Sequence, residues 1–487
     1  MNFKAVRSSA MPSPLLRFTL AVTVAAAAQA ALARELPPEV ERALRQAQVP
    51  AESLAVVVQE VGSGRSRLAL HADAPMNPAS LTKLLTTYAA LDILGTAWTW
   101  STPVWLQGTL ADGVLDGSLV IQGQGDPKLV IERLWLLLRR VQQLGVHEIH
   151  GDIVLDHGAF TAIGGAPGDF DNEPSKPYNV LPDALLVNYK SVTYTFTPDA
   201  ARGVATVAAE PALAGVQVDA SVPLLPGPCE DWRAALKPAL ADPRHTRFAG
   251  GFTQACGERV WAVAYADPAS YNARVVEALW REMGGRLSGT VHDGVASPSL
   301  KPNFELLSPT LAEVVRDINK YSNNTMAQQL FLTLALNQRG APATPQAARE
   351  VLERWVAERF GERAAQETVI VNGSGLARET RASAQLLARV LQGAWAASVM
   401  PELMSSLPIT GLDGTLRKSR APAGRAHLKT GSLRDVAGVA GYVLGDSGKR
   451  YVLVALVNHP NANAARPAID ALLEWTMRDA SRARTPR

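Results

Sequence analysis

The sequence predicts an α/β protein with an antiparallel sheet built from both ends of the chain. Strand-like stretches lie at residues 54–71 and again at 427–458, and segments with helical spacing lie between them. Residues 161–261 hold many Pro and Gly between short apolar runs, which favours an inserted β-rich region. A chain of 487 residues exceeds the size of one core, so we expect two or three domains.

The first elements are a hairpin and a helix. Residues 54–61 are apolar and β-branched, Gly62-Ser63-Gly64 forms a turn, and residues 66–71 form the second strand. Asn77-Pro78 then interrupts the chain ahead of apolar residues at helical spacing, namely Leu81, Leu84, Leu85, Tyr88 and Ala89. Ser80 is therefore expected at the N-terminus of a helix.

The remaining elements follow from the same patterns. Strands are expected at 103–126, 148–156, 204–208, 216–222, 427–432, 439–444 and 451–458. Helices are expected at 129–144, 273–280, around 311–318 and from about 468. No fixed-period repeat is present.

The N-terminus carries the pattern of a secretory signal. Lys4, Arg7 and Arg17 precede an Ala-rich apolar stretch that ends at Ala31-Leu32-Ala33, a small-x-small cleavage site. A membrane anchor is the alternative, but the apolar run is short. Cleavage near Ala33 removes three positive charges and no acid, so the formal net charge falls from +3 to zero. We therefore expect a periplasmic protein with no nucleic-acid partner and no membrane span in the mature chain.

Cys229 and Cys256 are the two cysteines of the chain. In an oxidising compartment they can pair, and closing this loop stabilises a protein by roughly 3 kcal/mol. Two buried thiols are the alternative. Their number and their place in one Pro- and Gly-rich region favour a disulfide.

Three short strings carry the chemistry: Ser80-Leu81-Thr82-Lys83, Ser322-Asn323-Asn324 and Lys429-Thr430-Gly431-Ser432. Residues three apart share a helix face, so Ser80 and Lys83 can meet as nucleophile and base. A lysine accepts a proton only if burial or a second cation lowers its pKa, and Lys429 could be that cation. A single Ser-x-x-Lys string is weak evidence for catalysis. This pair, however, is the only one in the chain, and it lies at the start of a helix, where backbone N–H donors favour an oxyanion.

The second string can be read in other ways. Ser270-Tyr271-Asn272 also fits Ser-x-Asn, although Ser270 follows Asp267-Pro268 and is better explained as a helix N-cap. Tyr321-Ser322-Asn323 fits the Tyr-x-Asn frame of class C β-lactamases. Ser322 lies late in a helical segment where no cap is expected, which favours a proton relay by Ser322 and substrate positioning by Asn324.

The third string occurs once, on an expected edge strand. Its backbone can align an extended peptide, with Lys429 and the Thr430 and Ser432 hydroxyls facing a terminal carboxylate. Gly431 permits close approach. Metal and cofactor signals are weak: His147 and His150 lack the zinc-protease arrangement and no dinucleotide or phosphate loop is complete, so neither group is expected.

Together these strings resemble the low-molecular-mass class C penicillin-binding proteins of the penicillin-binding protein 4 type, D-alanyl-D-alanine carboxypeptidases and endopeptidases. The 242 residues between Ser80 and Ser322 fit that family, which inserts two domains there. Further matching strings are Gly125-Asp126-Pro127, Gly151-Asp152-Ile153, Asn372-Gly373-Ser374-Gly375-Leu376, Thr410-Gly411 and Asp413-Gly414-Thr415.

The resemblance implies a serine β-lactamase/penicillin-binding transpeptidase-like fold: an antiparallel sheet flanked by helices, an all-helical lobe and two inserted β-rich domains. We expect a signal peptide at 1–33, a catalytic domain at 34–96 and 300–487, a second domain at 97–160 and 262–299, and a third at 161–261.

The resemblance also implies a substrate and its pocket. The expected activity is hydrolysis of D-Ala-D-Ala in peptidoglycan stem peptides, and of D-Ala-diaminopimelate crosslinks, through an acyl-enzyme that β-lactams also form. Asp156, Phe160 and Arg378 would line the diaminopimelate pocket. The family usually has Asp where this chain has Asn372, and often Gln where it has Arg434. A β-lactamase and a catalytically idle wall-binding protein are the alternative functions.

Overall fold

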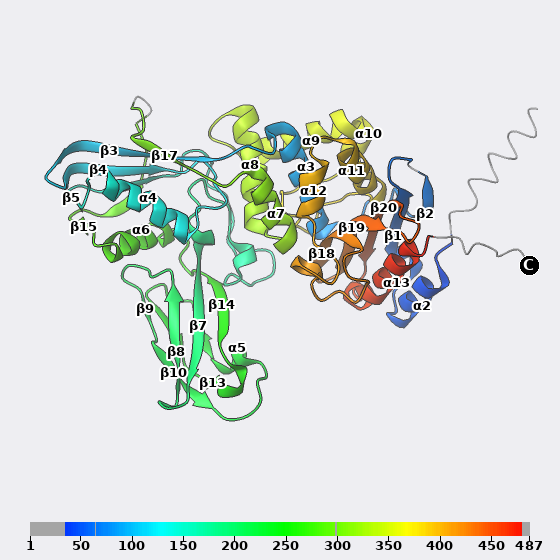
Figure 1. Cartoon of the computed structure of the whole chain (residues 1–487), viewed down its shortest axis with the longest axis horizontal. Coiled ribbons are helices and arrows are strands. Elements are labelled where there is room, and N and C mark those ends of the chain that lie inside the picture. The colour runs from blue at the N-terminus through cyan, green and yellow to red at the C-terminus, as the bar shows by residue number, and fades with distance from the viewer. Residues whose placement is uncertain (1–34, 64, 298–299, 480–487) are drawn as a thin grey trace, which may run out of the picture.

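The computed structural model describes residues 35–63, 65–297 and 300–479. The expected signal peptide at 1–33 lies outside these residues. Figure 1 shows β-sheets, with their own helices or loops, arranged around a helical centre. None of the described helices is both long and apolar enough to cross a bilayer.

The first sheet joins the two ends of the chain, as the sequence predicted. Its five antiparallel strands run in the order β18-β19-β20-β1-β2. Val56 and Val58 of β1 pack on one side of the sheet with α2 and α13, while Ala55 and Val57 pack on the other with α11. Because both faces are covered, β1 is a continuous apolar run rather than an alternating one. The bounds are β1 Leu54–Glu60, β2 Ser66–Leu70, β18 Ala426–Leu433, β19 Val436–Leu444, β20 Arg450–Asn458, α2 Pro38–Gln46, α11 Ala384–Ala396 and α13 Arg466–Met477.

A helical lobe packs beside this sheet, and α3 contributes apolar side chains both to the core of the lobe and to the core against the sheet. Thr310 and Glu313 form a capping box at the start of α7, and Asn323 caps α8. The bounds are α3 Thr82–Leu94, α7 Leu311–Tyr321, α8 Asn324–Arg339, α9 Pro345–Phe360, α10 Glu362–Gln366 and α12 Met400–Ser406.

A seven-stranded sheet forms the second β-rich part, covered by α4 and α6. Its last strand, β17, pairs with β3. Residues 304–307 therefore belong to this sheet, so the boundary that we placed between 299 and 300 is too early. The bounds are β3 Ser101–Ala111, β4 Val114–Gln122, β5 Glu148–Ile149, β6 Ile153–Asp156, β15 Arg286–Leu287, β16 Val291–Gly294, β17 Phe304–Leu307, α4 Ile131–Gln143 and α6 Tyr271–Glu282.

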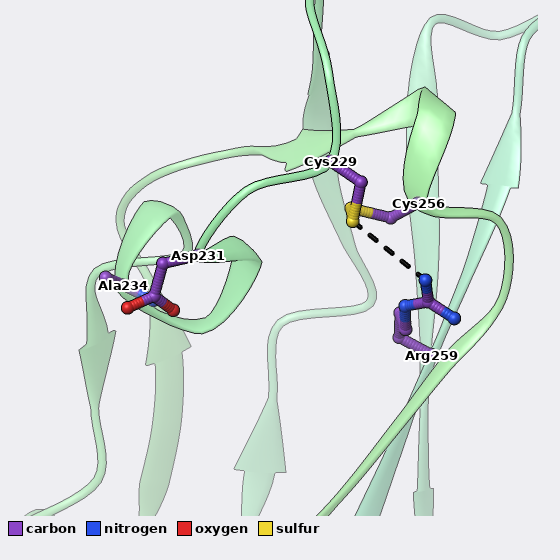
Figure 2. The surroundings of a disulfide bond; sticks show 5 residues. All are labelled: Cys229, Asp231, Ala234, Cys256 and Arg259. Atoms are coloured by element: carbon purple, nitrogen blue, oxygen red, sulfur yellow. Dashed lines mark hydrogen bonds between the residues drawn. A yellow bond between two sulfur atoms is a disulfide. The ribbon is translucent and has the colours of Figure 1, made fainter. Parts of the chain in front are cut away.

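The third part projects from the rest of the molecule in Figure 1. Its aromatic core includes Phe196, Phe248 and Phe252, and a disulfide joins Cys229 to Cys256, as predicted (Figure 2). A five-stranded sheet runs β13-β10-β8-β7-β14, beside a small sheet β11-β12-β9. The bounds are β7 Ser191–Asp199, β8 Val204–Glu210, β9 Gln217–Val218, β10 Ser221–Leu225, β11 Pro238–Ala239, β12 His245–Phe248, β13 Phe252–Thr253, β14 Arg259–Ala264 and α5 Trp232–Ala235.

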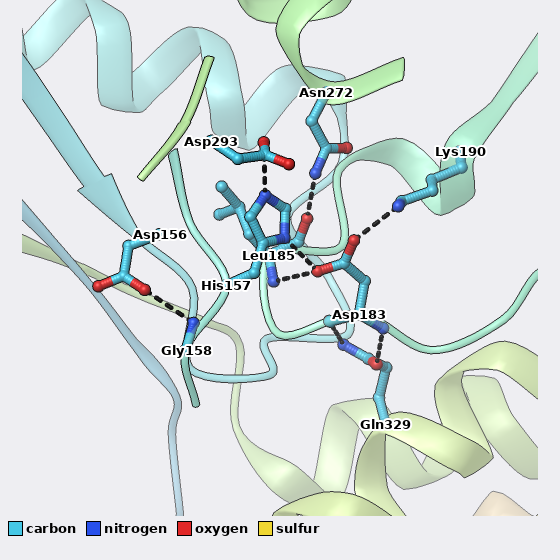
Figure 3. Close-up of polar contacts among 9 residues, drawn as sticks. All are labelled: Asp156, His157, Gly158, Asp183, Leu185, Lys190, Asn272, Asp293 and Gln329. Atoms are coloured by element: carbon cyan, nitrogen blue, oxygen red, sulfur yellow. Dashed lines mark hydrogen bonds and ion pairs between the residues drawn. The ribbon is translucent and has the colours of Figure 1, made fainter. Parts of the chain in front are cut away.

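A partly buried ionic network lies where the inserted segments meet the helical lobe, with the Asp293 side chain exposed at its edge (Figure 3). Asp183 accepts a hydrogen bond from His157 at 2.5 Å and pairs with Lys190 at 2.6 Å, while His157 also faces Asp293 at 3.3 Å. The Asp183 backbone exchanges two hydrogen bonds with Gln329 of α8. The network therefore fastens the inserted segments to the helical lobe.

Candidate active site

Ser80 lies on a 3-10 turn, Ala79–Leu81, that leads directly into α3. Asn77 holds this turn from both sides: its Oδ1 accepts from the Ala79 backbone, and its Nδ2 donates to the carbonyls of Ala377 and Arg378. The position at a helix start agrees with the sequence prediction. It presents the Ser80 hydroxyl at the mouth of a cavity.

Lys83 is completely buried one helical turn further on. Its Nζ lies 2.9 Å from Ser80 Oγ and donates to Asn324 Oδ1 at 2.8 Å and to the Ser374 carbonyl at 2.7 Å. All of these partners are neutral. Burial, and then the positive charge of Lys429, lower the pKa of Lys83 well below its ordinary value. A neutral amine beside a serine hydroxyl is the arrangement that a lysine base requires.

Ser322 does not lie inside a helix, contrary to our expectation. It is the C-cap of α7 and adopts the left-handed conformation, with φ 56° and ψ 37°, between α7 and α8. Asn323 then caps α8 by accepting from Met326 N, and Asn324 points to Lys83. The tight connection thus directs Ser322 and Asn324 to the site, which favours the Ser-x-Asn frame over Tyr-x-Asn.

The competing triplet lies elsewhere. Ser270 holds the N-cap position of α6, but its hydroxyl donates to Asp267 and accepts from Arg274 instead of capping the backbone. Asn272 is buried and donates to the Leu185 carbonyl. Neither side chain reaches Ser80, so this triplet is structural.

Lys429 lies on β18, an edge strand as predicted. Its Nζ donates to Ser322 Oγ at 2.9 Å and to the Thr430 carbonyl at 2.8 Å, and burial lowers the pKa of Lys429 to about 7. Gly431 sits against the Ser80 turn: a Cβ there would lie 2.7 Å from the Pro78 carbonyl. Glycine therefore lets the strand approach the turn that carries Ser80.

Ser80 opens into a cavity of about 580 Å³ between the edge strand and the helical lobe. Four of the predicted site residues line it together with Ser80, namely Ser322, Asn324, Arg378 and Ser432. Lys83 and Lys429 lie buried beneath, and Thr430 and Gly431 line an adjoining cavity. A separate cavity of about 390 Å³ beside His157 does not include Ser80.

Asp156 and Phe160 do not line the Ser80 cavity, contrary to our expectation. Asp156 is buried and accepts hydrogen bonds from Gln122, the Gly158 backbone and the Ala296 backbone. The ring of Phe160 packs against Gly125. Both residues instead stabilise the junction of the inserted segments (Figure 3 shows Asp156 bound to Gly158).

Their place in the Ser80 cavity is taken by a loop that the sequence analysis missed. Phe170, Asp171 and Tyr178 line the cavity, and Tyr178 donates to Asp171 at 2.9 Å. The Arg378 guanidinium stacks 5.0 Å from the Phe170 ring, and Arg434 completes this wall. An Asp-Phe-Asp string in a Pro- and Gly-rich loop was the available signal, but nothing local linked it to Ser80.

Asn372 has a structural task. Its Oδ1 accepts from Ser374 N, Ser374 Oγ and Gly375 N, while its Nδ2 donates to the Leu376 carbonyl. This turn aims the Ser374 carbonyl at Lys83. The amide, with both a donor and an acceptor, satisfies every partner, which a carboxylate could not. No group of three or more metal-binding side chains occurs among the described residues.

Comparison with known proteins agrees with this geometry. A family model described as the D-Ala-D-Ala carboxypeptidase 3 (S13) family matches residues 36–479. The chain belongs to this family. The match spans the first sheet, the helical lobe and both inserted parts, so the family relationship covers the whole described architecture.

Individual relatives are distant but extensive. The chain is 25% identical over 402 residues to a D-alanyl-D-alanine carboxypeptidase DacB of Haemophilus influenzae, covering 79% of this chain and 80% of that one. It is 26% identical over 484 residues to a D-alanyl-D-alanine carboxypeptidase of Actinomadura sp. The aligned region covers 94% of this chain and 87% of the relative. The crystal structure of penicillin binding protein 4 of H. influenzae matches with a TM-score of 0.71 at 22% identity. The match covers 89% of this chain and 99% of that structure.

Proposed function

We propose that this protein is a serine-type D-Ala-D-Ala carboxypeptidase that also cuts D-Ala-diaminopimelate crosslinks of peptidoglycan in the periplasm. The observation that carries the proposal is the 2.9 Å contact between Ser80 Oγ and a buried Lys83 Nζ without a carboxylate partner among the described residues. Family membership supplies the D-Ala-D-Ala substrate.

Acylation begins at Ser80. Neutral Lys83 accepts the hydroxyl proton as Ser80 Oγ attacks the carbonyl of the penultimate D-Ala. The backbone N–H groups of Ser80 and Ser432 hold the oxyanion, and each such donor stabilises the transition state by about 3 kcal/mol. The edge strand β18 aligns the extended peptide beside these donors.

The leaving amine then takes a proton. Lys429 and Ser322, which are 2.9 Å apart, form the relay toward the leaving nitrogen. Asn324 joins Lys83 to the substrate side of the cavity and positions the peptide amide. Water finally hydrolyses the acyl-enzyme and frees Ser80, with no cofactor required.

The far wall of the cavity suits a side chain with both an amine and a carboxylate. Asp171 can pair with the amine, and Arg378 and Arg434 can pair with the carboxylate, while Phe170 supports the Arg378 plane. Diaminopimelate has both groups. Asp171 and Phe170 thus replace Asp156 and Phe160 in our proposal for this subsite.

Labelled penicillin tests the nucleophile. We expect a stable covalent adduct on the wild-type protein and none on Ser80→Ala, because the strained amide of a β-lactam imitates the terminal dipeptide. An unlabelled wild type, or equal labelling of Ser80→Ala, would falsify the assignment. Rapid hydrolysis of penicillin would instead favour the β-lactamase alternative.

Purified crosslinked sacculi test the substrate range. We expect free D-Ala from pentapeptide stems and separated stem peptides from crosslinked dimers, both detected by chromatography and mass spectrometry. Release of neither product from wild-type digests would support the idle wall-binding alternative.

A further inference from the structure

A second cavity, of about 610 Å³, adjoins the active site on the other side of the edge strand. Its walls come from the loop with Lys418 and Arg420, from β18 and β19, and from the start of α13, where Arg466 lies. We call this the cationic pocket, defined by Lys418, Arg420 and Arg466. Ser432 lines both the cationic pocket and the Ser80 cavity, so the two meet at that residue.

The cationic pocket has an excess of positive charge. Three cations, Lys418, Arg420 and Arg466, line the pocket with one carboxylate, that of Asp470. Within the described part of the chain, none of the three cations forms an ion pair with a carboxylate. Unpaired cations around a concave surface attract anions.

Arg466 connects this charge to the reacting end of the substrate. Its guanidinium donates to Ser432 Oγ and to Asn463 Oδ1, both at 3.1 Å. Ser432 and Thr430 are the hydroxyls that we place at the carboxylate next to the scissile bond, and both line the cationic pocket. The leaving portion of a substrate therefore points into this pocket as it passes beyond Ser432.

We propose that the cationic pocket binds the leaving stem peptide of a crosslink through carboxylates that lie beyond the one next to the scissile bond. The inference rests on the proposed function. A single D-Ala leaving group carries one carboxylate, which Thr430 and Ser432 engage. The leaving group of a crosslink continues as a second peptide with further carboxylates, and Lys418 and Arg420 are the cations placed to meet them.

The test compares two substrates on one variant. Lys418→Gln combined with Arg420→Gln removes the two outer charges of the cationic pocket and leaves the Ser80 cavity intact. We expect the KM for a purified crosslinked muropeptide dimer to rise about three- to tenfold. The kcat and KM for release of D-Ala from a monomeric pentapeptide should stay within about twofold. Added salt should reduce the difference between the variant and the wild type in the KM for the dimer.

Arg417→Gln is the matched control, because Arg417 is an exposed neighbour that does not line the pocket. It should leave the KM for the dimer unchanged. An unchanged KM for the dimer in the double variant, or equal changes with both substrates, overturns the inference. Failure of the proposed function looks different: the wild type would then neither react with penicillin nor release D-Ala from the monomer.

Discussion

Two clusters of charged side chains in this protein, one fully buried and one partly buried, differ in how their charges are balanced. Beneath Ser80, Lys83 and Lys429 contact neutral oxygens alone, and the pKa of each lysine is lowered. Where the inserted segments meet the helical lobe, His157 and Lys190 face Asp183 and Asp293. An unbalanced buried cation becomes a base, whereas a balanced network keeps its charges and fastens the structure.

The pKa directions express the same contrast. Burial raises the pKa of Asp183, but the hydrogen bond from His157 and the charge of Lys190 outweigh it and lower that pKa to about 2. Burial likewise lowers the pKa of His157, but Asp183 and Asp293 raise it above its ordinary value. We therefore assign the lysine cluster to catalysis and the ionic network to stability.

The largest expected effect follows from removing the base. Lys83→Met should slow acylation by labelled penicillin about a thousandfold or more, because Ser80 loses its proton acceptor. The melting temperature should not fall, since a buried amine is replaced by an apolar chain of similar volume. Stopped labelling reactions and thermal unfolding measure the two quantities. Acylation at a near wild-type rate would remove Lys83 from the mechanism.

The second effect falls on the balanced network. Asp183→Asn leaves His157 and Lys190 buried without their shared carboxylate, and the free energy of unfolding should drop by about 3 to 5 kcal/mol. Penicillin acylation of the folded variant should remain close to wild type. Urea unfolding followed by circular dichroism measures the loss. A stable variant with slow acylation would reverse the two assignments.

This variant should also change the pH dependence of stability. Wild-type Asp183 contributes stability above the pKa of an unfolded Asp, near 4, and loses it as the pH falls toward about 2. His157, with its raised pKa, contributes below about pH 6.5 and loses that contribution as the pH rises through its folded pKa. In Asp183→Asn, the free energy of unfolding should therefore depend less on pH, both in the acid range set by Asp183 and in the near-neutral range set by His157.

A third prediction concerns the pH profile of acylation. The rate should fall on the acid side as Lys83 becomes protonated. Because the charge of Lys429 helps to lower the pKa of Lys83, Lys429→Met should raise that pKa and move the acid limb of the rate profile to higher pH. Lys449→Met, at an exposed ion pair with Glu60, serves as control and should leave the limb in place. A limb that moves downward in Lys429→Met contradicts the coupling.

The smallest effect tests the turn that aims the Ser374 carbonyl. In Asn372→Asp the side chain can no longer donate to the Leu376 carbonyl, so we expect a loss of about 1 kcal/mol in unfolding free energy. The new negative charge should raise the pKa of Lys83 and shift the acid limb upward, by less than Lys429→Met does. The same penicillin profile measures it. A limb unchanged from wild type would show that position 372 has no electrostatic influence on Lys83.

Local pattern was enough to predict several parts of the site. A proline break before helical spacing placed Ser80 at a helix start, and spacing of three placed Lys83 beside it. Apolar β-branched runs predicted the terminal strands because both faces of that sheet are covered. The paired cysteines were predicted from number and location alone.

Other features depend on contacts that no local pattern encodes. Ser322 was expected inside a helix, but α7 ends there, and the left-handed backbone of Ser322 turns the chain into α8. Asp156 is buried at the junction and the loop with Phe170 and Asp171 occupies the wall instead. The domain boundary that we placed near residue 300 lies later in the chain, because β17 pairs with β3, which comes some 200 residues earlier.

The sequence by itself therefore determined which groups we propose to react, since the serine, the amine and the edge strand each need a residue type at a short fixed spacing. Only the tertiary structure decided how buried these groups are and which charges surround them. Burial without counter-charge is a property of the assembled core, and it lowers the pKa of Lys83, whereas Lys190 lies in contact with Asp183. The walls of both cavities were decided in the same way, by segments far apart in the chain that meet only after folding.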